Sequence, residues 1–390
     1  MELYGYLVVI WRPFNLIVNF AGLLVTILLK LFMRAGVMLD HRNTYQDNAS
    51  NPLVSVIIPT YNRADTLPES IDSVLQQTYS PIEIIVIDDG SIDHTAEVIK
   101  PYLPKIRYIK QSNAGLAMAR NAGMAAAKGE YFAWLDSDDL FEPHKVAVQI
   151  QVMQTWPEVV LCCTDFSAFD EKGVISLSHL SEYYSIIKIK GLQNIYQNHE
   201  NLDFLAAVDS SQRISTRICF GNLYPALMFG NVVHPPTILM RRSVYDTLGG
   251  LDAQFCSGAD YEYAIRVAKA GQIACVNQPL LRYRYSVDQM SSDKNAVSGW
   301  ADILRVLMHQ LTVDFGLING VDGNVSERIG QVHWSLATAY LEKNKHMALT
   351  HLVKAIRLGY VGKKWQRVLM KLVLPSVYIR WYRRRVKRIG

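Results

Sequence analysis

Three carboxylates occur within four residues, at Asp136, Asp138 and Asp139, directly after the apolar run 131–135. Carboxylates this close together at the end of a buried strand repel one another unless a cation or hydrogen bonds compensate their charge. Mg²⁺ and Mn²⁺ take oxygen ligands, and Mg²⁺ typically uses one or two carboxylates together with substrate phosphates. The cluster therefore predicts either a divalent metal held for a phosphate-bearing ligand or a solvated acidic turn that caps the next helix.

The elements that must position these carboxylates follow from the hydrophobic pattern around them. Strand-like runs alternate with segments that have apolar residues at helical spacing. We expect strands at 54–63 (running into a turn), 84–91 (ending in acidic residues and a glycine), 106–109 and 131–135, and helices at 66–77, from about residue 93, and in the Ala-rich segment that ends at Lys128.

Strands that read as continuous apolar runs between helices predict an α/β fold, with a mostly parallel sheet flanked by helices on both faces. Ligands of such sheets bind outside the carboxyl ends of the strands. Three successive strands deliver polar residues to that edge, namely Tyr61, Asp88 with Asp89, and Asp136 with Asp138. We therefore prefer a ligand site over a simple acidic turn.

Three competing motifs are absent from the chain. No GxGxxG follows the first strand, which argues against a dinucleotide-binding fingerprint, and no GxxxxGK[ST] occurs, which removes a P-loop kinase or ATPase. The acidic run that begins at Asp136 does not match an EF-hand, because Leu140 stands at the fifth position and Phe141 replaces the glycine at the sixth.

An ordered set of motifs resembles the inverting family-2 glycosyltransferases, which have the Rossmann-like GT-A fold. The motifs are VSVIIPTYNR, IIVIDDGSIDHT, NAGLAMARNAG, GEYFAWLDSDD, GGLDAQF and ADYEYAIR, and the similarity covers roughly residues 52–292. The resemblance implies a nucleotide-diphosphate sugar as donor, a divalent metal (Mn²⁺ or Mg²⁺) and a single displacement that inverts the anomeric centre. A UDP-sugar is the preferred donor.

The resemblance assigns the donor site residue by residue. It places Pro59, Tyr61 and Arg63 in the segment that lines the nucleoside pocket. Asp89, with Asp88 as its neighbour, matches the residue that accepts a hydrogen bond from the imide N–H of the base. A carboxylate at this position suits uracil without excluding another base that carries an imide.

The remaining donor-site residues also come from the resemblance. Asn113 and Arg120, followed by Asn121, lie in the stretch that borders the nucleotide. The DxD pair is Asp136, which reaches the ribose or a metal-bound water, and Asp138, which ligates the metal.

An inverting displacement needs a carboxylate that takes the proton from the acceptor hydroxyl. The family places this base second in an acidic pair, and Asp260 falls on that position while Ala259 replaces the usual glutamate before it. We expect Asp260 to be the base, with Glu262 as the less favoured substitute.

A second departure from the family concerns the leaving group. Ser286 stands where the family often has a histidine near the diphosphate and metal, so Arg282 or Arg284 is the possible diphosphate contact. His234 lies either near the acceptor or in a structural turn beside two prolines.

The chain divides into four predicted parts. Residues 1–38 form a hydrophobic membrane-associated segment, 50–295 the GT-A domain, 296–360 a helical extension with a tetratricopeptide-like hairpin at 330–358, and 361–390 a basic amphipathic tail. The polar region 182–220 is interpreted as an insertion on the acceptor side. Five cysteines show no metal-ligand spacing, and their odd number argues against a disulfide framework.

Both ends of the chain favour a membrane surface as partner. Residues 14–33 are mostly apolar and borderline for a spanning helix, which needs about 20 apolar residues, or else they form a shallow interfacial hairpin. The tail holds ten Lys and Arg and no acidic residue, which leaves 30 basic and 35 acidic residues elsewhere. We expect association with the inner membrane, a catalytic domain on the cytoplasmic side, and no nucleic-acid partner.

The predicted function is transfer of a sugar to a hydroxyl of a glycan or lipid-linked acceptor in the assembly of cell-envelope polysaccharide or glycolipid. Two alternatives stay open. One is transfer to a polyprenyl phosphate, whose acceptor oxygen is already ionised. The other is a catalytically degenerate nucleotide-sugar-binding module of the membrane, suggested by Ala259 and Ser286.

Overall fold

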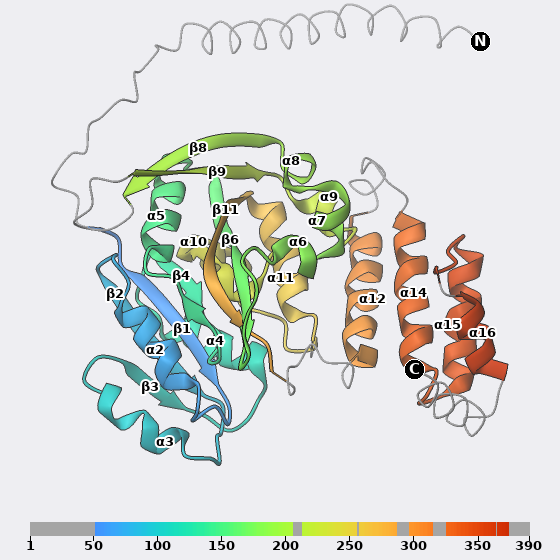
Figure 1. The fold of residues 1–390 in the computed structure, drawn as a ribbon, viewed down its shortest axis with the longest axis horizontal. Helices are drawn as coiled ribbons and strands as arrows, with labels where there is room; N and C mark the ends of the chain where they lie inside the picture. The colour runs from blue at the N-terminus through green and yellow to red at the C-terminus, as the bar shows by residue number, and fades with distance from the viewer. Residues whose placement is uncertain are drawn as a thin grey trace, which may run out of the picture. The chain divides into compact units, whose positions relative to one another are not determined.

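The computed structural model describes residues 51–205, 213–255, 257–286, 296–314, 325–363 and 365–373. They belong to one compact unit built around an 11-stranded sheet. The strands lie in the order β3 (Arg107–Lys110), β2 (Ile82–Asp88), β1 (Val54–Thr60), β4 (Tyr131–Trp134), β10 (Leu239–Arg241), β6 (Val159–Asp170), β11 (Gln272–Arg284), β9 (Arg213–Gly221) and β8 (Asn198–Leu205), with β5 (Leu140–Phe141) on β11 and β7 (Gly173–Ser176) on β6 (Figure 1).

The α/β class with a large central sheet is confirmed, but the prediction of a mostly parallel sheet is wrong. Strands β3, β2, β1 and β4 run parallel to one another, and β6 and β11 form a further parallel pair. The three-residue strand β10 runs antiparallel to both β4 and β6, and β9 runs antiparallel to β11 and β8. A continuous parallel run is therefore confined to β3, β2, β1 and β4, where strands alternate with crossover helices.

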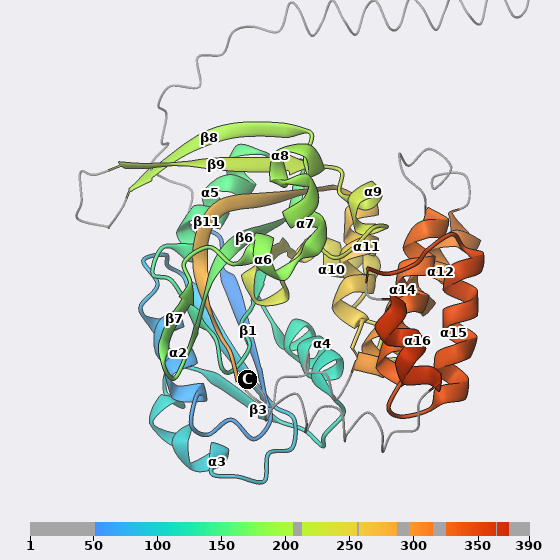
Figure 2. The same cartoon turned by 45° about the vertical axis from the view of Figure 1, so that its right-hand side comes forward.

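Helices α2 (Leu67–Leu75), α4 (Leu116–Ala126), α5 (Lys145–Thr155) and α11 (Ala259–Ala270) pack on this sheet (Figures 1 and 2). Helix α4 approaches β1 closely at Gly123, where a Cβ atom would lie 2.2 Å from Cγ2 of Ile57. Trp134 of β4 contacts both Arg120 of α4 and Tyr263 of α11. Helices α4 and α11 therefore cover the same face of β4, although they are far apart in sequence.

Short helices occupy the connections. They are α3 (Thr95–Val98), the 3₁₀ turn η1 (Lys100–Tyr102), α6 (Leu180–Tyr183), α7 (Ser185–Lys190), α8 (Leu192–Ile195), α9 (Tyr224–Leu227), the 3₁₀ turn η2 (Pro235–Thr237) and α10 (Arg242–Leu248). Ile92, just before α3, is 88% exposed. The polar region 182–220 folds as α7, α8 and part of the β8–β9 hairpin.

The extension consists of α12 (Ala296–Val313), α14 (Val325–Tyr340), α15 (Lys345–Arg357) and α16 (Trp365–Val373), which lie side by side in both views (Figures 1 and 2). Helices α14 and α15 occupy the predicted hairpin at 330–358. Val306 of α12 and Val332 of α14 are fully buried members of the same core as the sheet. Helices α12 and α14 therefore share the hydrophobic core of the sheet.

Within the part of the chain that the structure describes, no helix is long and apolar enough to cross a membrane. The predicted hydrophobic segment 1–38 lies outside the described residues, as does the tail beyond residue 373. The membrane association of both ends therefore stays a prediction.

A histidine pair joins α14 and α15, and it makes the stability of the protein depend on pH. The Nδ1 atoms of His333 and His351 lie 2.9 Å apart. Burial, and then His351 and Lys354, lower the pKa of His333 to about 4, and burial also lowers the pKa of His351. An unfolded histidine has a pKa of about 6.5, so the unfolded chain binds more protons between pH 6.5 and 4.

We therefore expect the unfolding temperature to fall as the pH is lowered through that window, and stability to be fully present above it. Circular dichroism melts between pH 7.5 and 4.5 measure this dependence. Burial lowers the pKa of His234 to about 3. This residue therefore also makes stability fall as the pH is lowered. Replacing His333 with glutamine should make the dependence shallower, and an unchanged slope would contradict a role for the pair.

Candidate active site

The acidic turn 136–139 follows β4 and is held in place by α2. Thr66 Oγ1 donates a hydrogen bond to the carbonyl of Ser137 (2.8 Å), and Ser70 Oγ donates to the carbonyl of Asp139 (2.8 Å). The turn closes on itself, since the N–H of Asp139 donates to the carbonyl of Asp136 (3.0 Å). The side chains of Asp136 and Asp138 stay partly exposed at the strand edge, as the sequence predicts.

Arg284, at the end of β11, braces the same turn from the other side. Its backbone N–H donates to Asp139 Oδ1 (2.9 Å), its Nε donates to the carbonyl of Asp138 (2.8 Å), and its guanidinium pairs with Glu69 (2.6 Å). The structure therefore gives Arg284 a positioning role. Its neighbour Arg282 is exposed and stacks on Phe169 with the guanidinium carbon 4.8 Å from the ring centroid.

The carboxylates of the turn repel one another. Burial, and then the charge of Asp136, raise the pKa of Asp138, while Arg63, whose Nε lies 3.6 Å from Asp138 Oδ2, lowers it. Burial and the two neighbouring carboxylates raise the pKa of Asp139 well above its usual range. An added cation would relieve this repulsion.

The residues present fit a divalent metal of the Mg²⁺ type. Among the residues that the structure describes, no three His, Cys, Asp or Glu side chains converge as a complete protein cage. Mg²⁺ typically needs only one or two carboxylates when substrate phosphates supply further ligands. Asp138 offers a partly exposed carboxylate, and the buried Oδ2 of Asp139 has no hydrogen-bonding partner among the described residues. Asp138 is the better candidate ligand because it faces solvent.

Arg120 lies beneath the acidic turn rather than on the surface of α4. The residue is only 3% exposed, its guanidinium donates to Asp136 Oδ1 at 2.6 Å, and it stacks over the ring of Trp134 at 4.8 Å. Its Nε is buried and has no partner among the described residues. The side chain predicted to border the nucleotide therefore holds Asp136 from below.

The candidate base Asp260 stands in the first turn of α11, partly buried. Burial raises the pKa of its carboxyl, Arg120 and the backbone N–H groups at the helix start lower it, and the charge of Asp136 raises it further. These interactions bring Asp260, Arg120 and Asp136 into one electrostatic group. The structure thus unites residues that are more than 120 positions apart in the sequence.

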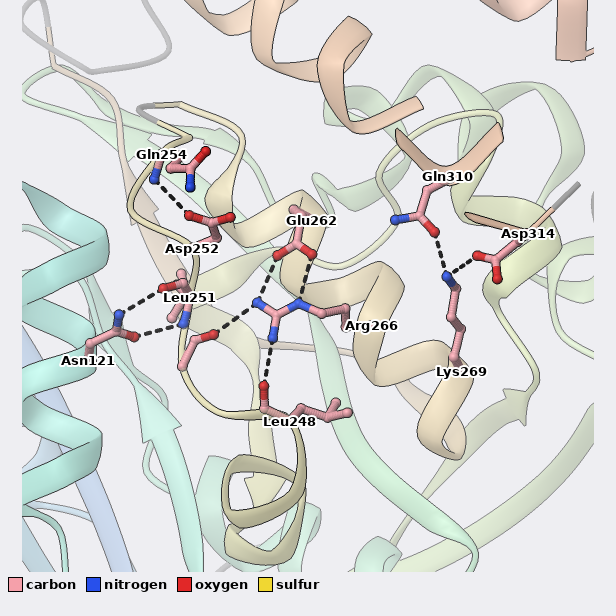
Figure 3. A network of polar contacts seen from close by, with 11 residues as sticks. Asn121, Leu248, Leu251, Asp252, Gln254, Glu262, Arg266, Lys269, Gln310 and Asp314 are labelled. Carbon is pink, nitrogen blue, oxygen red and sulfur yellow. Dashed lines mark hydrogen bonds and ion pairs between the residues drawn. The ribbon is translucent and has the colours of Figure 1, made fainter. Parts of the chain in front are cut away.

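Glu262 is engaged elsewhere. Its two carboxylate oxygens accept hydrogen bonds from Nε and a terminal nitrogen of Arg266 at 2.7 and 2.8 Å, and the residue is 6% exposed. Arg266 also donates to the carbonyls of Leu248 and Gly250 (Figure 3). Glu262 therefore fixes α11 to the preceding loop, which leaves Asp260 as the candidate base of this helix.

Two further contacts hold α11 and its preceding loop (Figure 3). The Asn121 side chain makes a pair of 2.8 Å hydrogen bonds with the backbone of Leu251, donating to its carbonyl and accepting from its N–H. Lys269 at the far end of α11 donates to Gln310 and Asp314 at the end of α12. Asn121, predicted to border the nucleotide, thus helps to hold the loop before the helix that carries the candidate base.

Asp302 of α12 is a positioning residue that the sequence analysis did not find. It is 2% exposed and accepts a hydrogen bond from the N–H of Ser257 at 2.8 Å, just before α11. A Cβ atom at Gly258 would lie 2.9 Å from Cβ of Asp302, so this glycine permits the close approach. An acidic residue at a core-facing position of the amphipathic segment 296–313 was the available signal.

The loops after β1 and β2 are joined by their own hydrogen bonds. The N–H of Asn62, which has a positive φ of 52°, donates to Ser91 Oγ (3.0 Å), and the N–H of Ile92 donates to Asn62 Oδ1 (2.9 Å). Pro59 is buried inside β1, whereas Tyr61 exposes 45% of its surface beyond the strand. Of the first motif, Tyr61 and Arg63 are thus the side chains available to a ligand.

Asp88 and Asp89 have different environments. The fully buried carboxylate of Asp88 accepts from the Ser91 N–H (2.7 Å) and the Tyr108 hydroxyl, and lies 3.7 Å from Lys110. These partners lower its pKa against the opposing effect of burial. Asp88 therefore holds the turn after β2, and its predicted place among the nucleotide-binding residues stays a prediction.

Asp89 shapes the loop that contains Asn113. Its Oδ1 accepts from Gln111 Nε2 (2.7 Å) and the N–H of Ala114 (2.9 Å), and its Oδ2 accepts from the N–H of Gly115 (2.8 Å). A carboxylate oxygen can accept two hydrogen bonds, so Oδ2 retains capacity for a further donor. Asn113 is exposed on the same loop.

The two remaining predicted positions are His234 and Ser286. His234 is buried, stacks on Phe166 at 4.1 Å and hydrogen-bonds the Tyr184 hydroxyl through Nδ1 at 3.1 Å. Burial, and then the charge of Arg120, keep this imidazole neutral by lowering its pKa to about 3. Ser286 is exposed after β11.

Comparison of the chain with known proteins identifies its family. Residues 55–208 match the family model described as glycosyl transferase family 2. A glycosyltransferase of Rickettsia prowazekii is 27% identical over 316 residues, which are 80% of this chain and 86% of that protein. One of Rickettsia typhi is 32% identical over 61% of this chain and 66% of that protein. Against a longer glycosyltransferase of Rickettsia conorii, 41% identical, the chain spans 39% of the relative's length.

Solved structures share the fold at low sequence identity. S. aureus TarS 1–349 in complex with UDP-GlcNAc aligns over 78% of this chain and 81% of that one, with a TM-score of 0.53 and 15% identity. The mannosyltransferase PcManGT of Pyrobaculum calidifontis, in complex with GDP-Man and Mn²⁺, aligns over 83% of this chain and 86% of that one. Its TM-score is 0.52 and its sequence identity is 15%. The chain is therefore a transferase that belongs to glycosyltransferase family 2 and has the GT-A fold.

Proposed function

We propose that this enzyme moves a sugar from a nucleotide diphosphate, preferably UDP, to a hydroxyl of a glycan or lipid-linked acceptor, with inversion at the anomeric centre. The observation that carries the proposal is the 2.6 Å ion pair of the buried Arg120 with Asp136, together with the influence of both charges on the pKa of Asp260. It supports a candidate base near the candidate metal and diphosphate site. Complexes of the fold relatives with UDP-GlcNAc and with GDP-Man support a nucleotide-sugar donor.

The donor site would be assembled at the carboxyl edge of β1, β2 and β4. Tyr61 offers an exposed ring to the nucleoside, and Asp89 offers a carboxylate to an imide N–H, the group that uracil carries. Asp138, the second residue of the DxD pair, would hold Mn²⁺ or Mg²⁺, which supplies charge stabilisation to the diphosphate leaving group. The Mn²⁺ complex of PcManGT supports this choice.

The roles of the protein's own residues follow from the geometry. Asp260 takes the proton of the acceptor hydroxyl, and its raised pKa makes it a stronger base than an exposed aspartate. Arg120 keeps that carboxylate ionised and fixes Asp136 through a 2.6 Å ion pair. Arg284 and Arg63 stabilise the acidic turn, and either guanidinium could share the charge of the diphosphate.

The pH dependence of catalysis tests the role of Arg120. Replacing Arg120 with glutamine removes the cation that lowers the pKa of Asp260 and leaves Asp136 unpaired, and both changes raise that pKa. We expect the acidic limb of kcat/KM to move to higher pH in Arg120→Gln, and to move less in Arg120→Lys, which keeps the charge. Rates of UDP release between pH 5 and 9 measure the acidic limb of the pH profile. If this limb lies at the same pH in the unsubstituted enzyme, Arg120→Gln and Arg120→Lys, then Arg120 does not influence the pKa of Asp260.

We also propose that both ends of the chain contact the inner membrane from the cytoplasmic side. The described helix α16 supports this, because Trp365, Leu369 and Met370 are exposed on a helix that also carries Arg367 and Lys371. Sedimentation of the full chain with phosphatidylglycerol vesicles, but not with phosphatidylcholine vesicles, is the expected result. Equal failure with both lipids would refute the proposal.

Turnover of the donor tests the enzyme proposal itself. Incubation with UDP-sugars should release UDP slowly without an acceptor, in a reaction that needs Mn²⁺ or Mg²⁺ and is lost in Asp138→Ala. Binding of a UDP-sugar without any turnover would instead favour the degenerate module. Turnover stimulated only by a polyprenyl phosphate would favour the alternative acceptor.

A further inference from the structure

A cluster of aromatic rings beside Asp260 has no part in the donor chemistry. The cluster has seven members, and the ring centroid of each lies within 6.2 Å of another member's. They come from β6, from α6 and the residue on either side of it, from the residue before η2, and from the end of β11 and the residue after it. We name it the aromatic cluster, and its residues are Phe166, His179, Tyr183, Tyr184, His234, Tyr283 and Tyr285.

The cluster adjoins the candidate base. After burial and Tyr183, the charge of Asp260 is the next cause that raises the pKa of Tyr184. On the other side, the charge of Arg120 acts on His234. Tyr184 and His234 are themselves joined by the 3.1 Å hydrogen bond. Helix α11, which carries Asp260 in its first turn, also packs on β6, the strand that carries Phe166. The aromatic cluster therefore lies within electrostatic range of both Asp260 and Arg120.

Strand alternation separates the cluster from the arginines of β11. Tyr283 turns toward Phe166 (5.7 Å between centroids) and His234 (5.0 Å). Arg282 and Arg284 turn to the opposite side, where their guanidinium carbons lie 4.8 and 4.7 Å from the Phe169 ring.

Among the described residues, the groups near the cluster offer little unpaired positive charge. The low pKa of His234 leaves its ring uncharged at neutral pH. The Nδ1 atom of His179 lies 3.3 Å from the Glu182 carboxylate, and Arg120 is already paired with Asp136. A phosphate group is recognised by cations and charge-assisted hydrogen bonds, so this surface does not suit a phosphate.

The cluster combines apolar faces with polar edges. Tyr183, Tyr184, Tyr283 and Tyr285 are partly exposed, and the Tyr285 hydroxyl lies 3.0 Å from His179 Nε2. The Nε2 atom of His234 is buried and has no hydrogen-bonding partner among the described residues. Aromatic rings pack against apolar surfaces while tyrosine hydroxyls and imidazole nitrogens exchange hydrogen bonds. A pyranose ring presents the matching surface, with C–H faces and hydroxyl edges.

We propose that the aromatic cluster is the acceptor subsite and that it binds a neutral sugar ring, which presents one hydroxyl to Asp260. The proposal rests on the proposed function. In the transfer, the hydroxyl oxygen forms a bond to the anomeric carbon of the donor as the bond from that carbon to the diphosphate oxygen breaks. The proton of the hydroxyl passes to Asp260, and the bonding electrons leave with the nucleoside diphosphate.

Saturation-transfer difference NMR on the full chain with UDP and Mn²⁺ tests the subsite. The probes are methyl pyranosides of glucose, galactose, mannose and N-acetylglucosamine, with geranylgeranyl phosphate as the phosphate comparison. We expect at least one glycoside to give a signal, its Kd to rise about tenfold in Tyr183→Ala through loss of the stacked ring, and to rise less in Tyr183→Phe. Leu349→Ser, which removes an exposed apolar side chain of α15, is the control and should leave the signal unchanged.

Two results would overturn the subsite. One is the absence of any glycoside signal that responds to Tyr183→Ala, and the other is a Tyr183-dependent signal from geranylgeranyl phosphate alone. A separate thermal-shift measurement with UDP-sugars and Mn²⁺ distinguishes the two proposals. A retained donor shift without a glycoside signal rejects only the acceptor subsite, whereas loss of the donor shift rejects the proposed function.

Discussion

Replacing Asp260 with asparagine is expected to lower kcat for transfer to a hydroxyl by about 10²–10⁴-fold, the range contributed by general acid–base catalysis. Asparagine keeps the size of the side chain in the first turn of α11 but cannot take a proton. Because Asp260 is assigned to the acceptor proton, the Kd for the UDP-sugar should change little. Steady-state UDP release with an acceptor sugar gives kcat, and titration calorimetry gives the Kd.

Glu262→Gln is the matched control on the same helix. Its carboxylate is held by Arg266 in a bidentate pair, so the variant should lose thermal stability while the folded enzyme keeps most of its kcat. Undiminished transfer to a hydroxyl by Asp260→Asn would show that Asp260 is not the base. Loss confined to hydroxyl acceptors, with transfer to a polyprenyl phosphate retained, would support Asp260 as the base, because the phosphate oxygen is already ionised.

The second large effect is expected at Asp138. Asp138→Asn should abolish the dependence of donor binding on Mn²⁺ and reduce kcat/KM by about 10²–10³-fold, since metal-ion stabilisation of a leaving group supplies several kcal/mol. Burial and Asp136 raise the pKa of Asp138, so removing its charge relieves repulsion. The unfolding temperature without metal should therefore stay the same or rise. Thermal shift with and without Mn²⁺ and UDP-sugar measures both quantities.

Asp139→Asn separates metal binding from support of the turn. Asp139 Oδ1 accepts from the N–H of Arg284 at 2.9 Å and its other oxygen is buried. This variant should change the unfolding temperature of the metal-free protein while the additional shift caused by Mn²⁺ and donor is retained. If Asp138→Asn keeps a full Mn²⁺ response and Asp139→Asn loses it, the metal ligand has been assigned to the wrong carboxylate.

The first half of the sheet and its polar edge could be predicted because the signals are local. β1, β2 and β4 each have a continuous apolar run followed at once by polar residues, and parallel pairing brings those ends together. Tyr61, Asp136 and Asp138 accordingly lie partly exposed at that edge. Asp88 follows the same pattern, but its inward orientation depends on Tyr108 of the neighbouring strand.

The second half of the sheet could not be predicted from periodicity. β10 has three residues, too few to show an alternating pattern, and its direction depends on the turn η2 before it. β11 pairs with β6 through several register shifts. Strand direction there is decided by pairing between distant segments, which a short stretch of sequence does not reveal.

The residues that position the site could not be predicted for the same reason. Arg284 braces a turn 145 residues away, and Asn121 pairs with a backbone segment 130 residues away. Asp302 reaches the start of α11 from a helix that the sequence placed in a separate extension. Family resemblance identified positions such as Arg120 and Asp260, whereas their mutual arrangement needed the structure.

The most direct test of the account is a thermal-shift screen of nucleotide sugars with the full chain, with and without Mn²⁺. A ligand that binds only the folded state raises the unfolding temperature according to its concentration relative to its Kd. We predict that one nucleotide sugar, preferably a UDP-sugar, stands apart in the presence of Mn²⁺ and that Asp138→Asn removes its advantage. If no nucleotide sugar shifts the transition under either condition, the carboxyl edge of β1, β2 and β4 is not a donor site.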